Sequence, residues 1–308
     1  MSRSSVETNA PGSPIDRVKA APARAKVMLA RARARWGWVD VVLATFKRFG
    51  DDDSGTSAAA LTYYAFFAIF PLLLFAAAAV GYLTFGNEDL RTDIINAAVN
   101  GVPVVRDALK PGGLAFIEAH RSALAGTGLV LALYSGTGVI VALQHALNRV
   151  FHVPHEGNWF QKRFRSLKWL VVLGVTALLS LAMTTVAGLA DGWVSSSLGY
   201  VGGLAISTVT FMTAFKFLVA VDLSWRDVLP GAIVAAIIFE ILKVGGGLYL
   251  SHGDSARNDT YGTLAGAAAL LVASYLISQV TLLAAEVNAV LIERRAQRGS
   301  PQQIEEDA

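Results

Sequence analysis

Cysteine is absent from this chain of 308 residues. Disulfides, thiolate metal sites and cysteine nucleophiles are therefore excluded. Charge is also scarce, because Asp, Glu, Lys and Arg make up 16% of the residues, against about 25% in soluble globular domains. Hydrophobic residues reach 54%, and the mean hydropathy is +0.50. So many apolar side chains have to be solvated by lipid, which indicates an integral membrane protein.

Motifs for nucleotide or acyl chemistry are also missing. The sequence holds no phosphate-binding loop of the Gly-Lys-Ser/Thr kind and no nucleophile elbow. Its 5 histidines are scattered, and only His152 and His155 have the spacing of metal ligands. Glu156 stands beside them, but no third well-placed ligand completes the set. We therefore expect no catalytic residues, no cofactor, no bound metal and no use of ATP as an energy source.

Long apolar runs dominate the sequence instead. No charged side chain occurs between residues 260 and 285, and about 20 apolar residues suffice to cross ~30 Å of hydrocarbon as a helix. The same criterion predicts six membrane-spanning helices, at about 58–83, 123–147, 169–190, 201–221, 228–250 and 261–292. The expected fold class is all-α, a polytopic membrane helical bundle that occupies residues 58–292.

The segments outside the spans differ in composition. Residues 1–25 are rich in Ser, Pro and Ala and lack the apolar core of a signal peptide, so we expect a disordered cytoplasmic tail. Residues 86–122 alternate charged and apolar side chains, which predicts an amphipathic helical segment at the outer face. Residues 293–308 are expected to form a second cytoplasmic tail.

Residues 26–50 combine cations with aromatic side chains. The cations include Lys26, Arg31, Arg33, Arg35, Lys47 and Arg48, and the aromatic residues are Trp36, Trp38, Phe46 and Phe49. We expect an interfacial helix whose aromatic rings lie among headgroups and whose cations face anionic lipid. Asp51, Asp52 and Asp53 should end it. Nucleic-acid binding is the rival explanation of the basic run, but the tryptophans and the adjoining spans favour the membrane.

The distribution of cations predicts the orientation. Six spans place both termini on one side of the membrane. The N-terminal segment, the loop over residues 149–168 and the segment after the sixth span are basic, whereas the opposite loops are neutral or acidic. Because cytoplasmic loops carry an excess of Lys and Arg, both termini should be cytoplasmic.

Polar side chains inside the apolar runs are the candidate functional residues. At about 1.5 Å per residue, Glu240 and Gln279 fall near the bilayer centre, Lys243 lies slightly beyond, and Glu286 lies within about two turns of the cytoplasmic surface. Glu240 and Lys243 are three apart and can pair on one helix face. This pair either neutralises itself in the bundle or lines, with Gln279, a cavity for an ion, proton or headgroup. Glu286 either joins this path or pairs with Arg294 or the basic inner loop.

Amides and tyrosines complete the predicted polar path. Asn148 and Asn288 lie near the ends of the second and sixth spans. Tyr63, Tyr64 and Tyr134 lie within the first two spans. The tyrosines are interpreted either as core residues that hydrogen-bond to their neighbours or as residues that border the cavity.

Two places in the spans should be flexible. Pro71 lacks a backbone N–H and should bend the first span. Gly245, Gly246 and Gly247 weaken the fifth span by about 1 kcal/mol each relative to alanine in water. These glycines serve either close helix packing or a gating hinge.

Five stretches of the chain form an ordered set of motifs. They are the first span from Ala58 to Pro71, Asn148-Arg-Val-Phe, Trp225-Arg-Asp-Val-Leu-Pro-Gly-Ala, Tyr261-Gly-Thr-Leu-Ala-Gly and Ala285-Glu-Val-Asn-Ala-Val-Leu. Over about residues 36–292 this set resembles the YihY/BrkB family of bacterial inner-membrane proteins. The chain departs from the family pattern at Ala284, where glycine is more common, and at Ser274, where tryptophan is. The resemblance implies a six-span helical fold in the bacterial inner (plasma) membrane, with a basic cytoplasmic N-terminus. Family members carry the labels ribonuclease BN and virulence or serum-resistance factor, without a settled biochemical activity.

The leading hypothesis is a non-ATP-driven transporter or channel-like protein that moves an ion, small solute or lipid along the polar path. The alternative is an envelope scaffold or lipid-interacting protein, linked to virulence or serum resistance, that docks through its outer segment and basic helix. A ribonuclease is least favoured, because the sequence lacks a nuclease metal cluster. The expected partners are the bilayer, anionic headgroups and a small solute or ion, and we expect neither enzymatic activity nor a nucleic-acid partner.

Overall fold

The computed structural model describes residues 37–83, 121–153, 166–177, 179–180, 183, 193–252 and 263–299. Helices and the turns between them make up these ranges, which contain no strand. The long helices are α2 (Gly37–Asp51), α3 (Ser54–Leu83), α7 (Arg121–Val150), α9 (Trp193–Leu218), α10 (Trp225–His252) and α12 (Thr263–Gly299). A shorter apolar helix is Ser166–Ala177. The all-α fold class is thereby confirmed for the described part of the chain.

Five of the described helices are long and apolar enough to cross a membrane. Their spanning windows are Ser54–Leu72, Gly126–Val150, Ser197–Leu218, Trp225–Gly246 and Gly266–Gln297, which match the first, second, fourth, fifth and sixth predicted spans. Of the third predicted span, the structure describes the shorter helix Ser166–Ala177 and only three residues beyond it. Five spanning helices are therefore found, and the count of six stays a prediction.

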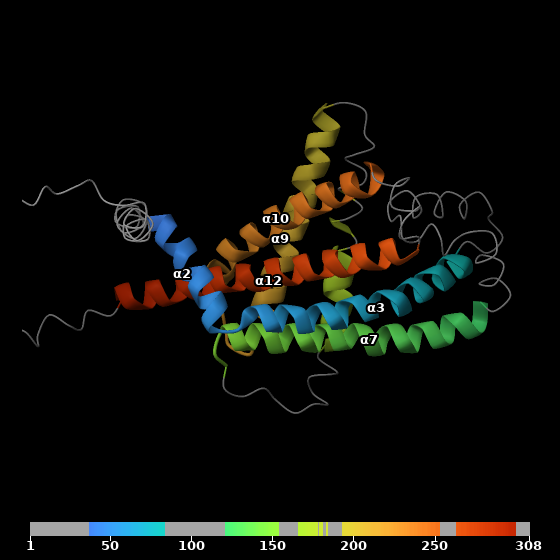
Figure 1. Cartoon of the computed structure of the whole chain (residues 1–308), viewed down its shortest axis with the longest axis horizontal. Helices are drawn as coiled ribbons and strands as arrows, with labels where there is room; N and C mark the ends of the chain where they lie inside the picture. Colours follow the sequence, from blue (N-terminus) through green and yellow to red (C-terminus); the bar gives the residue numbers. More distant parts are fainter. Residues whose placement is uncertain are drawn as a thin grey trace, which may run out of the picture.

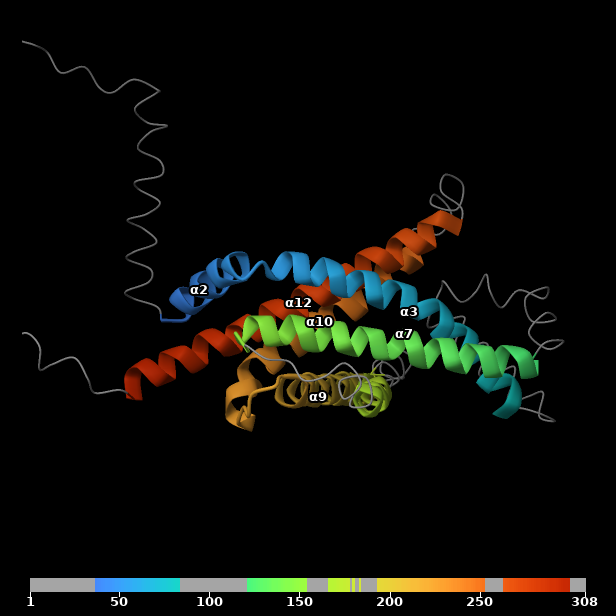
Figure 2. The same cartoon turned by 90° about the horizontal axis from the view of Figure 1, so that it is seen from below.

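Helix α12 is the central element of the bundle. It contacts α2, α3, α7 and α10, while α3 lies along α7 and α9 packs on α10. Both views show α3 and α7 side by side, and Figure 2 shows α9 in a separate layer on the far side of α10. Phe215 of α9, Leu147 of α7, Val228 of α10 and Leu282 of α12 are fully buried where these helices meet. The sixth predicted span, which contains the uncharged run of residues 261–285, is thus the helix around which the others pack.

The predicted break after the basic helix occurs at the three aspartates. Helix α2 ends at Asp51, and Asp53 has a positive φ of 51°, which aspartate tolerates better than most residues. Thr56 Oγ1 then donates to Asp53 Oδ1 at 2.8 Å in the first turn of α3. This tight turn folds α2 back toward the C-terminal half of α12, which α2 contacts.

The start of α10 depends on capping and on α12. The Ser224 hydroxyl and backbone N–H donate to Asp227 Oδ2 at 2.6 and 3.1 Å, as at a capped helix N-terminus. Pro230 has no N–H to offer the Arg226 carbonyl, which accepts from Arg295 of α12 at 3.4 Å. Helix α10, which carries Glu240, is therefore positioned by α12 from its first turn.

The two predicted flexible places both lie inside continuous helices. Helix α3 continues through Pro71 to Leu83 and curves over its second half (Figure 2). Helix α10 continues through Gly245 to Gly247. A Cβ added at Gly245 or Gly246 would meet no described atom within 4 Å. Close packing at these two glycines is therefore wrong for the described structure, and the hinge stays a prediction.

Some expectations concern residues that the structure does not describe. The N-terminal tail (1–25), the first part of the basic segment (26–36) and the outer segment (86–122) lie outside the described residues, apart from the first residues of α7. At the other end, α12 continues past residue 292 to Gly299. The described part of the basic segment is α2, and it is helical as expected.

Candidate functional site

Glu240 and Lys243 form the predicted ion pair on one face of α10. Lys243 Nζ lies 2.6 Å from Glu240 Oε1, and the two side chains are 9% and 14% exposed. The spacing of three residues places both on the same side of the helix, so the pair forms within one element. The prediction of an intrahelical pair is confirmed.

Two serines from other elements surround this pair. Ser207 of α9 donates to Glu240 Oε1 at 2.7 Å, and its Oγ lies 2.6 Å from Ser180 Oγ. Lys243 donates to Ser180 Oγ at 2.9 Å and to the Ser180 carbonyl at 3.4 Å. Both serines are buried. We call these four residues the Glu240 cluster.

Gln279 makes a different contact. Its Nε2 donates to the Tyr275 hydroxyl at 2.5 Å, one turn earlier on α12. No contact among the described residues joins it to Glu240 or Lys243. The structure therefore assembles the first two residues of the predicted path and leaves Gln279 on a separate helix with its own partner.

Glu286 is a fully buried carboxylate on α12, with an exposed fraction of 0%. Its Oε2 lies 3.1 Å from Arg48 Nε, and its Oε1 accepts from the Ser54 hydroxyl at 2.7 Å. Arg294, the partner considered from the sequence, pairs with Asp40 of α2 instead. The expected pairing of Glu286 with Arg294 is therefore wrong, because α2 folds back and brings a different arginine to the buried carboxylate.

Arg48 joins three helices. From α2 it reaches Glu286 and Glu293 on α12, and its Nη2 donates to the Val150 carbonyl at the end of α7 at 3.0 Å. Its side chain is 14% exposed. The expectation that the cations of this segment face lipid is therefore wrong for Arg48, whereas Lys47 is exposed. We call Arg48, Asp52, Glu286, Glu293 and His152 the Arg48 cluster.

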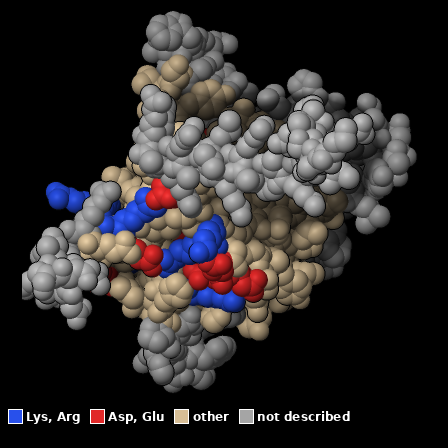
Figure 3. Space-filling view, turned by 60° about the vertical axis from the view of Figure 1, so that its left-hand side comes forward, with Lys and Arg blue, Asp and Glu red and all other residues tan. Residues whose placement is uncertain are grey.

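Negative charge exceeds positive charge around Arg48. Its guanidinium pairs with three carboxylates, those of Asp52, Glu286 and Glu293. Burial lowers the pKa of the Arg48 guanidinium, but the hydrogen bond and charge of Glu293 and the charges of the other two carboxylates outweigh it, so the pKa lies above its ordinary value. Figure 3 shows cationic and anionic side chains side by side at this end of the bundle. Arg48 therefore stays charged at every physiological pH.

His152 belongs to the same cluster. Arg48 Nη2 lies 3.0 Å from His152 Nδ1, and His152 Nε2 lies 3.1 Å from Asp52 Oδ1. Because arginine can only donate, Nδ1 accepts and Nε2 carries the proton that is donated to Asp52. His155 and Glu156, the other members of the weak metal pattern, lie outside the described residues. Within the described ranges, no group of three or more His, Cys, Asp or Glu residues could hold a metal ion.

Asn288 and Asn148 tie helices together. Asn288 is fully buried, accepts from the Gly231 N–H of α10 at 2.6 Å and donates to the Val228 carbonyl at 3.2 Å. Asn148 of α7 accepts from the Ala220 N–H at 2.8 Å, just after α9 ends. Both amides therefore link separate elements, and their place in a permeation path stays a prediction.

The three tyrosines of the predicted path lie on the surface. Tyr63, Tyr64 and Tyr134 are 59%, 47% and 69% exposed. Their interpretation as core residues is therefore wrong, since about half or more of each residue is exposed. The ring of Tyr63 packs edge-on against that of Tyr64, with the ring centroids 5.7 Å apart.

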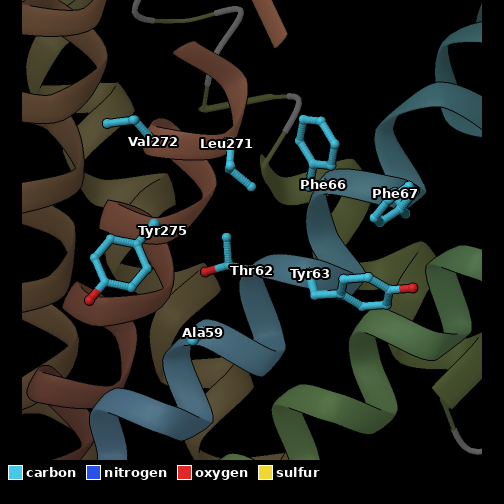
Figure 4. Close-up of a pocket in the computed structure, with 8 residues that line it drawn as sticks. All are labelled: Ala59, Thr62, Tyr63, Phe66, Phe67, Leu271, Val272 and Tyr275. Carbon is cyan, nitrogen blue, oxygen red and sulfur yellow. The ribbon is translucent and has the colours of Figure 1, made fainter. Parts of the chain in front are cut away.

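An apolar pocket of about 370 Å³ lies between α3 and α12. Its lining is Ala59, Thr62, Tyr63, Phe66 and Phe67 of α3 with Leu271, Val272 and Tyr275 of α12 (Figure 4). The Thr62 hydroxyl donates to the Ala58 carbonyl at 2.7 Å, so it is already satisfied within its own helix. None of the predicted charged residues lines this pocket.

Sequence reasoning missed Arg48, Ser54, Ser180 and Ser207. Arg48 was grouped with the lipid-facing cations because it follows Lys47 in a basic run. The available signal was Glu286 itself, because a carboxylate within a span needs a cationic or polar partner. The sequence does not show which residue supplies that partner, since this depends on how the helices pack. The serines carry no signal of their own, because single serines are common in membrane helices.

Comparisons with known proteins place this chain beside a defined set of membrane proteins. The family model for virulence factor BrkB matches residues 45–308. An uncharacterized protein of Dickeya dadantii is 28% identical over 262 residues, covering 77% of this chain and 79% of the relative. A UPF0761 membrane protein of Tolumonas auensis is 26% identical, covering 82% and 85%. YfkH of Bacillus subtilis, named as ribonuclease-like, is 24% identical, covering 81% and 94%. No solved structure matches the chain.

Proposed function

The chain belongs to the virulence factor BrkB family and is a multi-pass membrane protein, and from this premise we propose that it is a non-ATP-driven transporter or channel-like protein. Its cargo is an ion, small solute or lipid, and it has no enzymatic activity. It resides in the bacterial inner membrane with both termini in the cytoplasm, as the excess of cations in the N-terminal segment and after the sixth span supports.

The Glu240 cluster carries this proposal. An unpaired charge near the bilayer centre costs roughly 2.5 to 3.5 kcal/mol by insertion scales, and more by other measures. The pair at 2.6 Å reduces that cost but does not remove it, because two ions still leave water. An apolar pair of similar size would fit the same helix at no such cost. Ionisable residues in spans usually face a bundle interior or a water-filled path, and this cluster fits a polar step in such a path.

The test is charge movement across proteoliposomes that contain the purified full-length protein. A panel of monovalent ions and small anionic and cationic solutes is applied, and isotope exchange covers electroneutral flux. We expect flux in the wild type and its loss in Glu240→Gln, with folding retained. Asp222→Asn is the matched control, since Asp222 is a fully exposed carboxylate outside both polar clusters. Flux equal in wild type and Glu240→Gln, or no flux in either, would contradict the proposal.

A second candidate function is an envelope scaffold or lipid-interacting protein linked to virulence or serum resistance. The observation that favours it is the exposed face of α2, where Trp38, Val42 and Phe46 are 62%, 42% and 60% exposed. Their spacing of four residues puts them on one face, suited to the headgroup region, and Lys47 is exposed beside them for anionic lipid. Replacing Trp38 and Phe46 with serine should abolish the interaction of α2 with lipid headgroups and leave solute flux unchanged. Glu240→Gln should abolish solute flux and leave the interaction with headgroups unchanged.

A ribonuclease remains the least favoured function. Its support is the name of the Bacillus subtilis relative. The proposal of a non-enzymatic protein predicts that highly purified protein does not cleave RNA. Cleavage that disappears in His152→Ala would instead support the enzyme.

A further inference from the structure

The pocket between α3 and α12 is a cavity that the proposed function does not use. Its volume is about 370 Å³, and its eight lining residues are all uncharged. Five of them lie on α3 at positions 59, 62, 63, 66 and 67, whose spacing of three and four residues defines one face of the helix. Figure 4 shows this face across from α12, with Phe66 opposite Leu271 and Thr62 opposite Tyr275. The pocket is therefore a groove between the first and the last of the spanning helices.

The depth of the pocket in the membrane follows from its position along each helix. The Ser54 hydroxyl donates to Glu286 Oε1 at 2.7 Å, so these two residues lie at one level of the bundle. At about 1.5 Å per residue, Ala59 and Phe67 of α3 lie about 8 and 20 Å along the helix from that level, and Leu271 of α12 lies about 23 Å from it. Both lining segments lie within the spanning windows of their helices. With a hydrocarbon core about 30 Å thick, the pocket lies in its interior.

The pocket opens onto the surface of the bundle. Tyr63 and Phe67 of α3 and Leu271, Val272 and Tyr275 of α12 are exposed among the described residues. At this depth an exposed side chain contacts lipid tails, since hydrocarbon replaces water there. The pocket is thus continuous with the lipid-facing surface of both helices, and acyl chains are the molecules that reach its mouth.

The hydroxyl groups of the lining do not serve a polar ligand. The Thr62 hydroxyl donates to the Ala58 carbonyl, and the Tyr275 hydroxyl accepts from Gln279. Figure 4 shows the Tyr63 hydroxyl pointing away from α12, so Tyr63 offers ring carbons to the space between the helices. A polar solute or headgroup placed there would lose its hydration without gaining hydrogen bonds. A hydrocarbon chain has no hydration to lose and gains van der Waals contacts with the aromatic rings.

The dimensions of the pocket favour a single chain over a helix. From Ala59 to Phe67 the pocket extends about 12 Å along α3. A helix about 10 Å across would occupy roughly 900 Å³ over that length, which is more than twice the pocket volume of about 370 Å³. A second copy of this protein therefore does not fit into the pocket as a helix, whereas one extended chain of methylene groups does.

We propose that the pocket between α3 and α12 binds one acyl chain of a bilayer phospholipid. The chain lies between the two helices, where its methylene groups contact Phe66, Phe67 and Leu271. The site is separate from the Glu240 cluster, and the inference goes beyond the proposed function because it does not depend on transport. It also differs from the exposed face of α2, which is suited to headgroups.

Photocrosslinking tests the site directly. The full-length protein is reconstituted in nanodiscs of phosphatidylethanolamine and phosphatidylglycerol, with a small fraction of the lipid carrying a diazirine on one acyl chain, and adducts are mapped by peptide mass spectrometry. We expect the pocket residues to give a several-fold higher yield of adducts than Leu129, Val130 and Leu131, which form an exposed apolar surface of α7 outside the pocket. Equal yields on the two surfaces would show contact with annular lipid only and would overturn the proposal.

Filling the pocket should displace the chain. Ala59→Phe adds a ring to the lining from α3, and Leu271→Trp adds a larger one from α12. Both positions are exposed, so neither substitution places bulk in the core, and thermal unfolding should be unchanged. We expect each variant to reduce the pocket adducts about tenfold, a change of about 1.4 kcal/mol in binding free energy.

Val130→Phe on α7 is the matched control, because it adds bulk to an exposed apolar position outside the pocket and should leave the pocket adducts unchanged. Pocket adducts that persist at the wild-type yield in both filled variants would overturn the proposal. A dimer in which a second copy of the chain protects the pocket from labelling would also overturn it.

Discussion

Arg48 Nε lies 3.1 Å from Glu286 Oε2, across 238 positions of sequence, and both side chains are largely removed from solvent. The contact fastens α2, which precedes the first span, to the last spanning helix. Removing one member of a buried pair is costly because it leaves the other charge uncompensated. The Arg48 cluster is therefore expected to be a main determinant of stability.

Replacing Arg48 with alanine should lower the free energy of unfolding by about 3 to 5 kcal/mol, the usual cost of breaking a buried pair. The measurement is equilibrium unfolding of the purified protein in detergent micelles. Lys47→Ala is the control, because its side chain is exposed and its loss should change stability by about 0.5 kcal/mol or less. Equal effects of the two substitutions would show that Arg48 does not support Glu286.

Combining Arg48→Met with Glu286→Gln should recover part of the lost stability. The double variant removes both charges of the Arg48–Glu286 pair, and the glutamine can still accept from the Ser54 hydroxyl. A double-mutant cycle should give a coupling free energy of about 0.5 to 3 kcal/mol between the two positions. Strict additivity of the single effects would mean that the two residues do not interact in the folded protein.

Replacing Asn288 with alanine should loosen the start of α10. Two hydrogen bonds are lost, to the Gly231 N–H and the Val228 carbonyl, at a cost of about 1 to 3 kcal/mol. Hydrogen exchange followed by mass spectrometry should show faster exchange around Gly231. Asn148→Ala is the matched control, since it should speed exchange at Ala220 instead. If Asn288→Ala accelerated exchange at Ala220 more than at Gly231, this assignment would be contradicted.

Two glycines of α10 should respond oppositely to alanine. A Cβ at Gly231 would lie 2.6 Å from Asn288 Nδ2 and overlap the Ala284 carbonyl, so Gly231→Ala should destabilise the protein. Gly245 faces open space among the described residues, so Gly245→Ala should stabilise the helix by up to about 1 kcal/mol. Thermal unfolding in detergent distinguishes the two. If Gly245 is a gating hinge, the more stable Gly245→Ala protein should also show reduced flux.

The class of protein could be predicted from the sequence because it depends on local properties. Apolar runs of spanning length, such as the one from residue 261 to 292, form helices in a bilayer irrespective of their neighbours, since every backbone group must be bonded internally. The break at Asp51 to Asp53 is also local. The Glu240–Lys243 pair could be predicted for the same reason, because three residues of helix bring both side chains to one face.

The partners of buried polar groups depend on the fold. Arg294, eight residues along the same helix, was one predicted partner of Glu286 beside the basic inner loop, but the turn at Asp53 brings Arg48 to Glu286 and leaves Arg294 to Asp40. One of the two interpretations placed Tyr63 and Tyr64 in the core, yet whether a helix face meets protein or lipid is not encoded in an apolar run. The serines around Glu240 come from two other elements.

The sequence by itself determined that this protein is an α-helical membrane protein and that Glu240 and Lys243 share a helix face, because length, hydropathy and helical periodicity act within single segments. The tertiary structure alone decided that Arg48 neutralises Glu286, that Asn288 holds the start of α10 and that Ser180 and Ser207 complete the Glu240 cluster. These contacts join residues far apart in the chain, and only the packing of the helices selects them from many polar residues of the same kind.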